Sequence, residues 1–217
     1  QASGAGAARR ARVTGSEMRN PVLLIACGAI AREISQLCRQ PGWSHITLRC
    51  LDAALHNHPD RIVPALERMI LAERSRFGQI FVAYADCGTG GAIDRLLQHH
   101  RIARLPGAHC YEFLAGSASF HALADTEPGS FYLTDFLARH FDRLVRKGLG
   151  LDRYPQLMPE YFGNYRRLVY LAQTENPELE RLAQQHAAFL GLAYERQFTG
   201  LVHLQHAVGI EVLQWQN

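Results

Sequence analysis

The most constraining feature of this sequence is an apolar strand that leads, through a cysteine- and glycine-rich turn, into a helix. An apolar run at residues 80–84 is followed by the turn at 86–91, a helical pattern at 92–100 and a second apolar run at 102–105. Strands that are apolar throughout and alternate with helices are typical of parallel sheets covered on both faces. This stretch therefore predicts an α/β fold.

The same pattern occurs once earlier in the chain. Apolar residues 22–26 precede Cys27 and Gly28, and a helical pattern with apolar residues on one face follows at 29–39. Because the order of strand, turn and helix repeats, we expect these strands to lie parallel in one open sheet.

The rest of the chain extends this alternation. Strands are predicted at residues 45–51, 167–172 and 193–198, and helices at 59–77, 132–147 and 176–190. We expect one α/β domain over residues 18–217, with a mainly parallel open sheet of about five or six strands flanked by helices. Residues 113–166 are predicted to form a helical lobe inserted between the later strands.

Residues 1–17 differ from the remainder of the chain. They are rich in Ala and Gly, carry three arginines and lack the apolar core of a secretory signal peptide. We expect a disordered N-terminal extension here.

Charge and cysteine content exclude several classes of protein. The net charge is only +3, and no basic run beyond the N-terminus predicts a nucleic-acid groove. No apolar stretch approaches the ~20 residues that span a membrane. Five cysteines, an odd number without a secretory signal, argue against a disulfide framework and predict a reducing, cytoplasmic location. The absence of a CxxC pair excludes a zinc ribbon or zinc finger. The sequence leaves open whether the protein forms a homo-oligomer.

Three cysteines follow predicted strands directly or within a few residues: Cys27, Cys87 and Cys110. Ligands of open parallel sheets bind outside the carboxyl ends of the strands, so these thiols are expected to meet at one site. Three thiolates suit zinc with an open fourth position, or an iron–sulfur cluster with one open iron. The alternative is that they are small buried hydrophobic residues, which is the interpretation given to Cys38 and Cys50.

The glycine-rich turn has a second interpretation. Such turns at helix N-termini bind anions through backbone N–H groups, which makes Gly28, Gly88, Thr89 and Gly90 candidate ligand-binding residues. The sequence contains neither a GxGxxG nor a GxxxxGK[ST] motif, so no dinucleotide or P-loop site is predicted.

Several polar residues flank the predicted thiol site. Asp86, His109 and Glu112 are candidates for proton transfer, and His56 is a candidate ligand-binding residue that follows the second strand. The alternatives are a helix-capping role for Asp86 and ordinary loop positions for the histidines.

An aromatic cover over the crevice is also expected. Tyr161, Phe162 and Tyr165, with the pair Thr134 and Asp135, are predicted to close it and exclude water. The alternative is that the aromatic residues only pack the helical lobe onto the sheet.

Several longer motifs carry a family resemblance. They are LIACGA (24–29), LHN (55–57), YADCGTGG (84–91), GAHCYEF (107–113), EPGSFYLTDFL (127–137), LGLDRYPQL (149–157) and YFGNYRRLVYLAQT (161–174). Together they resemble the uncharacterised family called domain of unknown function 1638, from about residue 22 to residue 200. Members are often associated with corrinoid-dependent methyltransferase systems. The resemblance therefore implies a role in one-carbon transfer, with a small-molecule substrate or a corrinoid methyl-transfer protein as partner.

Two functions follow from the sequence. The first is a metal-binding protein with Cys-ligated zinc or iron–sulfur, as an enzyme or accessory factor in one-carbon and methyl-group metabolism. The second is a non-catalytic binding module for an anionic metabolite or cofactor in the glycine-rich crevice. Thiol redox chemistry is a third and weaker hypothesis, because no CxxC pair is present.

Overall fold

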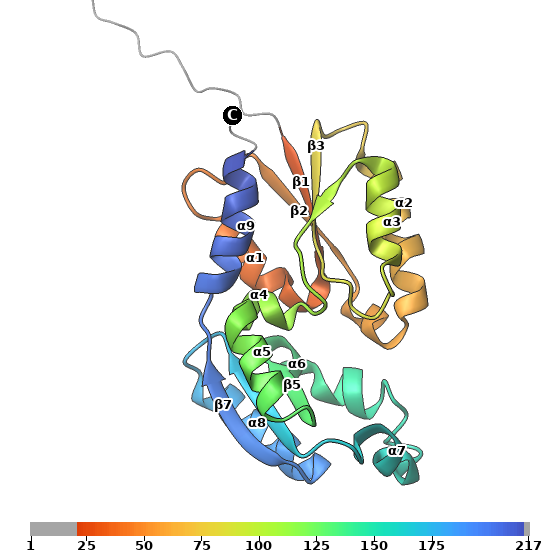
Figure 1. Ribbon diagram of the computed structural model, residues 1–217, viewed down its shortest axis with the longest axis vertical. Coiled ribbons are helices and arrows are strands. Elements are labelled where there is room, and N and C mark those ends of the chain that lie inside the picture. Colours follow the sequence, from red (N-terminus) through yellow and green to blue (C-terminus); the bar gives the residue numbers. More distant parts are fainter. Residues whose placement is uncertain (1–20, 215–217) are drawn as a thin grey trace, which may run out of the picture.

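The computed structural model describes residues 21–214 and contains two parallel sheets, one above the other in Figure 1. The first sheet has the strand order β2-β1-β3-β4, and the second has the order β5-β6-β7. The α/β class with parallel strands is therefore confirmed. The interpretation of residues 1–17 lies outside the described residues.

The first sheet is built from the repeated units that the sequence predicts. Its strands are β1 (Val22–Cys27), β2 (Ile46–Leu51), β3 (Gln79–Ala83) and β4 (Ala103–Arg104). The connecting segments hold α1 (Ala31–Cys38), α2 (Ile62–Glu73), α3 (Ala92–His100) and the 3₁₀ helices Gly28–Ile30, Ala53–Asn57 and Pro59–Arg61. β3 lies inside the sheet between β1 and β4, as its apolar sequence requires.

The second sheet follows later in the chain. Its strands are β5 (Ser130–Thr134), β6 (Arg167–Ala172) and β7 (Ala193–Phe198). The helices are α4 (Tyr111–Ala115), α5 (Ser117–Thr126), α6 (Asp135–Phe141), a π-helix (Asp142–Arg146), a 3₁₀ helix (Pro155–Leu157), α7 (Met158–Phe162), α8 (Pro177–Leu190) and α9 (Val202–Gln214).

Two details of the predicted architecture differ from the structure. The strands belong to two sheets instead of one, and residues 113–166 are not wholly helical because they include β5, which pairs with β6. The continuous helix expected at 132–147 begins only at Asp135. Thr134 ends the strand and caps this helix, since its Oγ1 accepts a hydrogen bond from the Leu137 amide at 3.2 Å.

Helix α8 forms where the sequence predicts it. The Asn176 side chain accepts hydrogen bonds from the Glu178 and Leu179 amides at 3.0 and 3.2 Å, and Pro177 occupies the first turn. Gly191 ends the helix in the left-handed region at φ +69°.

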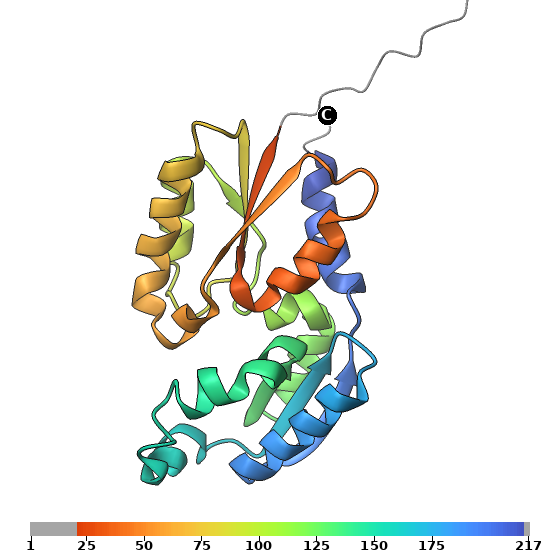
Figure 2. The ribbon, with the colours of Figure 1, turned by 180° about the vertical axis from the view of Figure 1, so that it is seen from behind.

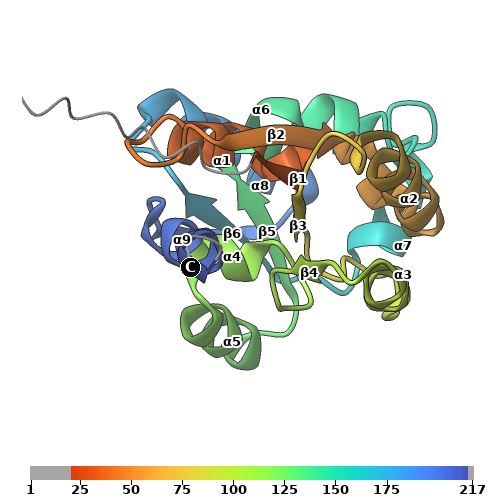
Figure 3. The ribbon, with the colours of Figure 1, turned by 90° about the horizontal axis from the view of Figure 1, so that it is seen from above.

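Helices cover both faces of each sheet. In the views of Figures 2 and 3, α1 and α9 lie on one face of the first sheet, and α2 and α3 on the other. In β6 the side chains alternate: Leu168 and Tyr170 pack toward α6 and α8, whereas Val169 and Leu171 pack toward α4 and α5. None of the helices in the described part of the chain is both long and apolar enough to cross a membrane.

The chain returns to the first sheet at its last described helix. Leu204 and Val208 of α9 are fully buried and belong to the same core as β1 and β3. In the sequence, the second sheet therefore lies between two segments, β4 and α9, that both belong to the first sheet and its core.

Candidate metal centre

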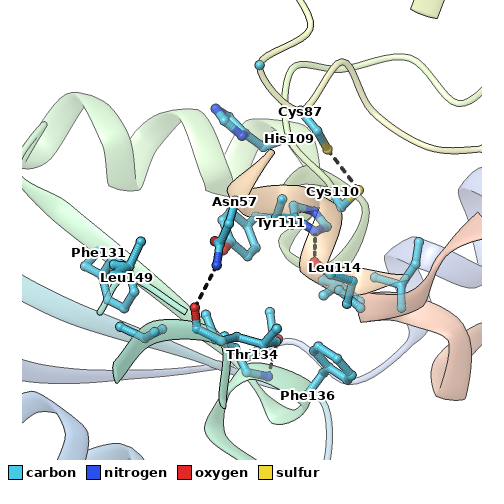
Figure 4. A pocket seen from close by; sticks show the side chains of 18 of the residues that line it. Asn57, Cys87, His109, Cys110, Tyr111, Leu114, Phe131, Thr134, Phe136 and Leu149 are labelled. Atoms are coloured by element: carbon cyan, nitrogen blue, oxygen red, sulfur yellow. Dashed lines mark hydrogen bonds between the residues drawn. The ribbon is translucent and has the colours of Figure 1, made fainter. Parts of the chain in front are cut away.

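A cavity of about 340 Å³ lies between the two sheets (Figure 4). One side is formed by residues that follow strands β1 to β4, and the other by β5, α6, the π-helix and α7. The carboxyl ends of the first-sheet strands therefore meet at this cavity, where open parallel sheets bind ligands. The lining residues are Ala29, Ile30, Ala53, His56, Asn57, Cys87, Gly88, His109, Cys110, Tyr111, Leu114, Phe131, Thr134, Phe136, Leu137, Leu144, Val145, Leu149 and Phe162.

The three cysteines predicted to converge lie together at this cavity. Donor atoms of Cys27, His56 and Cys110 all lie within 4.8 Å of one another, and the Cys87 and Cys110 sulfurs are 3.5 Å apart. Cys27 Sγ lies 3.6 Å from His56 Nε2. The structure thus joins the thiols into one group and adds an imidazole to it.

Cys27 is placed by the tight junction between β1 and β2. It is the last residue of β1, and its Sγ accepts a hydrogen bond from the Ala29 amide at 3.3 Å. A Cβ atom on Gly28 would lie 2.6 Å from the Leu51 carbonyl oxygen, so only glycine allows the two strand ends to approach this closely. This junction brings the 3₁₀ helix after β2 beside Cys27.

That 3₁₀ helix carries His56. Asp52 caps it by accepting a hydrogen bond from the Ala54 amide at 2.9 Å. His56 Nδ1 lies 2.9 Å from the Ala53 carbonyl oxygen, to which it donates, so Nε2 is the nitrogen that faces the thiols. Metal-bound histidines are commonly fixed in this way, with the second ring nitrogen held by a carbonyl group.

Cys87 and Cys110 are brought together by two adjoining loops. The Cys87 and Asp86 amides donate to the carbonyl groups of Ala108 and Gly107, at 2.9 and 3.1 Å. Cys87 itself adopts φ +48°, a left-handed conformation that is uncommon for residues other than glycine. The two loops therefore hold the Cys87 and Cys110 sulfurs against each other.

Cys87, Cys110 and His56 hold their protons tightly when no metal ion is bound. Contact with Cys110, and then burial, raise the pKa of the Cys87 thiol; contact with Cys27 and burial likewise raise the pKa of Cys110. Burial lowers the pKa of His56, but hydrogen bonding to Cys110 and Cys87 outweighs it and raises this pKa to about 10. A metal ion that binds here must therefore displace protons.

Tyr84 is a residue of the site that the sequence analysis missed. It follows β3, is fully buried, and its ring stacks on that of His56 with 6.3 Å between centroids. Burial first, and then the Cys27 thiol, raise its pKa, so the hydroxyl group stays protonated. Within residues 21–214 no hydrogen bond of ordinary geometry reaches this hydroxyl group, and its contact with the Cys27 thiol is a weak one.

The carboxylates predicted for proton transfer bind backbone amides instead. Asp86 accepts hydrogen bonds from the Thr89 hydroxyl group and the Gly90 and Gly91 amides. Burial raises the pKa of Asp86, but these bonds outweigh it and lower the pKa overall. Glu112 accepts from the Ala108 amide at 2.8 Å and faces a different cavity, so neither carboxylate lines the cavity between the sheets.

The other candidates divide between the cavity and its surroundings. His109 and Gly88 line the cavity, and His109 stacks on Tyr111 with 6.2 Å between ring centroids. Thr89 and Gly90 are bound within the Asp86 turn and do not line it. Cys38 and Cys50 are half-buried against the first core, where burial raises the pKa of each thiol.

The expected aromatic cover is present in part. Thr134 and Phe162 line the cavity, whereas Tyr165 packs behind it, 5.8 Å from Phe162 between ring centroids. Tyr161 is exposed. Asp135 is turned into the second sheet, where it accepts hydrogen bonds from Tyr170, Thr174 and the Gln173 amide.

Fold and site together define a parallel α/β protein whose two sheets enclose a cavity lined by Cys87, Cys110 and His56, with the Cys27 thiol beside them. The chain belongs to the family described as "Protein of unknown function (DUF1638)", whose model matches residues 50–208. The resemblance found in the sequence motifs is thereby confirmed. His56, Cys87 and Cys110 lie within the matched range, and Cys27 precedes it. No curated protein matches the chain.

Proposed function

We propose that this protein binds a thiophilic divalent metal ion, zinc in the first instance, through Cys27, His56 and Cys110. The observation that carries the proposal is the grouping of these three donor atoms within 4.8 Å, with His56 Nε2 directed at the thiols. Two sulfurs and one nitrogen are a known donor set for zinc sites that keep a fourth position for substrate.

The distances suit one ion better than a cluster. Two ligands of a tetrahedral zinc stand about 3.5 Å apart when one is sulfur and the other nitrogen, and Cys27 Sγ and His56 Nε2 are 3.6 Å apart. Thiolates on different irons of an iron–sulfur cluster are separated by the cluster itself. The Cys87 and Cys110 sulfurs, 3.5 Å apart, are too close to bind different irons, so the pair fits a single metal ion.

Each proposed ligand has a partner that would support it. The Ala53 carbonyl group orients His56, and the Ala29 amide donates to the Cys27 sulfur. The Cys87 thiol lies against the Cys110 sulfur, to which it can donate. Such outer contacts fix the direction of metal ligands and adjust their basicity.

The proposed centre adjoins the cavity, which suits an enzyme better than a purely structural site. Cys110 and His56 line the cavity, so a substrate there would reach the open position of the metal. A metal ion at this position would act as a Lewis acid, by polarising a carbonyl group or by activating a thiol. Methyl-group metabolism, with a corrinoid methyl-transfer protein as partner, is a further proposal supported only by the association of the family.

The alternative of an anion-binding module receives less support. Within the described chain, the side chains that line the cavity include no lysine or arginine. The amides of Gly90 and Gly91 already donate to Asp86, so the glycine-rich turn does not present them to a ligand.

Metal content is the direct test. The purified protein, reconstituted with zinc under reducing conditions and desalted, should retain about one ion per chain. Cys27→Ser, Cys110→Ser and His56→Ala should each lose it, whereas the matched controls Cys38→Ser and Cys50→Ser should not. Cys87→Ser should keep the ion with weaker affinity. Substoichiometric metal in the wild-type protein, or equal retention by all variants, would overturn the proposal.

A further inference from the structure

The walls of the cavity between the sheets carry no formal charge outside the metal centre. Of its lining side chains within the described chain, none is Lys, Arg, Asp or Glu. The side facing the second sheet is mostly apolar, and consists of Phe131, Phe136, Leu137, Leu144, Val145, Leu149 and Phe162 with Thr134. Figure 4 shows Phe131, Leu149 and Phe136 on the side away from Cys87 and Cys110.

Two polar side chains beside this apolar side make hydrogen bonds with its backbone. Asn57 Nδ2 donates to the Leu144 carbonyl oxygen at 3.0 Å, a bond that joins the two sides of the cavity. Thr134 Oγ1 accepts from the Leu137 amide. The other polar side chains that line the cavity, among them His56 and His109, are on the side that carries the thiols.

The nearest charged pair on α6 is also turned away from the cavity. Asp135 is fully buried among donors of the second sheet. Arg139 donates to the Asp135 carbonyl oxygen at 3.3 Å and lies 4.0 Å from its carboxylate. Neither residue lines the cavity.

We propose that this cavity binds an uncharged, mainly apolar small molecule, with one end at the metal centre and its body against the second sheet. The inference rests on the proposed function, because the metal provides the polar end of the site. A charged group placed among these side chains would lose its hydration without gaining a counter-charge, which is costly. A volume of about 340 Å³ is at the small end of ligand sites.

Three thiols of similar size test the inference on the cobalt(II)-loaded protein. The part of the molecule beyond the sulfur is an uncharged alkyl chain in 1-butanethiol, carries an anionic carboxylate in 3-mercaptopropionate, and carries a cationic ammonium group in cysteamine. Each offers cobalt the same sulfur donor, and the change in the visible spectrum on titration reports its affinity. We expect butanethiol to bind at least about tenfold more tightly than either charged thiol, a difference of about 1.4 kcal/mol.

A single substitution should reverse this preference. Phe136 is a half-exposed wall residue, and Phe136→Arg places a cation there. It should tighten 3-mercaptopropionate, weaken butanethiol, and leave the cobalt spectrum of the ligand-free protein unchanged.

The outcomes separate the two proposals. If cobalt binds but 3-mercaptopropionate binds the wild-type protein as tightly as butanethiol, the inference about the ligand is overturned and the metal centre stands. If the wild-type protein gives no thiolate-to-cobalt spectrum, both are overturned. Preference for butanethiol in the wild-type protein supports the inference even if Phe136→Arg fails to fold.

Discussion

Two buried tyrosines that differ in one hydrogen bond allow a matched test of the structure. Tyr84 and Tyr170 are both fully buried, and both belong to the sheet cores. The Tyr170 hydroxyl group donates to the Asp135 carboxylate at 2.6 Å, whereas the Tyr84 hydroxyl group has only a weak contact with the Cys27 thiol among the described residues. Substituting phenylalanine removes one oxygen atom in each case and leaves the ring in place.

The expected effects have opposite signs. A buried polar group without a partner costs about 1–3 kcal/mol, so Tyr84→Phe should raise the free energy of unfolding of the metal-free protein by about 1 kcal/mol. A hydrogen bond to a charged group contributes about 1.5–3 kcal/mol, so Tyr170→Phe should lower it by about 2 kcal/mol. At about 2–4 °C per kcal/mol for a chain of this size, the two melting temperatures should differ by about 6–12 °C.

Urea unfolding followed by circular dichroism, with chelator present, measures both variants under the same conditions. The dependence of the free energy on urea should be equal in the two variants, because the surface exposed on unfolding is the same. A Tyr84→Phe protein that is less stable than wild type by 1 kcal/mol or more, on the scale of a lost hydrogen bond, would show that this hydroxyl group has a partner. No unsatisfied hydroxyl group would then lie beside Cys27.

Three further predictions concern the metal centre and the junctions around it. Zinc affinity should rise steeply from pH 6 to pH 9, with protons released on binding, because the pKa values of the proposed ligands His56 and Cys110 are both raised. A pH-independent affinity in competition titrations would contradict this. In the metal-free protein, the pKa of His56 is raised to about 10, against 6.5 in the unfolded chain. Its contribution to stability is therefore complete below pH 6.5 and is lost as the pH rises to 10. Urea unfolding at several pH values measures this contribution, and His56→Ala should flatten the dependence of stability on pH. Gly28→Ala should destabilise the protein by about 2 kcal/mol or more, because the new Cβ atom would lie 2.6 Å from the Leu51 carbonyl oxygen. Gly78→Ala places its Cβ atom in open space and should change stability by less than about 1 kcal/mol. Equal shifts in the melting temperatures of the two variants would contradict this prediction.

The sequence was most informative where a feature depends on local chain geometry. The prediction that Cys27, Cys87 and Cys110 converge required only that each follows a parallel strand, and β1, β3 and β4 have this arrangement. The capped helix α8 was predicted for the same reason, since its start signals, Asn176 and Pro177, and its stop signal, Gly191, adjoin the two ends of the helix in the chain. Neither prediction needed a long-range contact to be known.

The features that were missed depend on tertiary contacts or on an ambiguous local pattern. β5 passes directly into α6 without a turn, so the helical spacing of apolar residues continues back into the strand and hides it. His56 stands beside Cys27 only because β1 pairs with β2 in a particular register. Asp86 and Glu112 are close to the cysteines in sequence, but backbone amides capture both carboxylates.

The path of the chain also sets the order in which the protein can be completed during synthesis. Helix α9 supplies Leu204 and Val208 to the core around β1 and β3, although β1 is made first. When the ribosome has completed β7, every strand of both sheets has been synthesised, yet the surfaces of α1 and α4 that α9 contacts are still uncovered. The core around β1 and β3 is therefore complete only after residues 202–208 have been made. Before that point, the surfaces of α1 and α4 that α9 covers are accessible to chaperones and proteases.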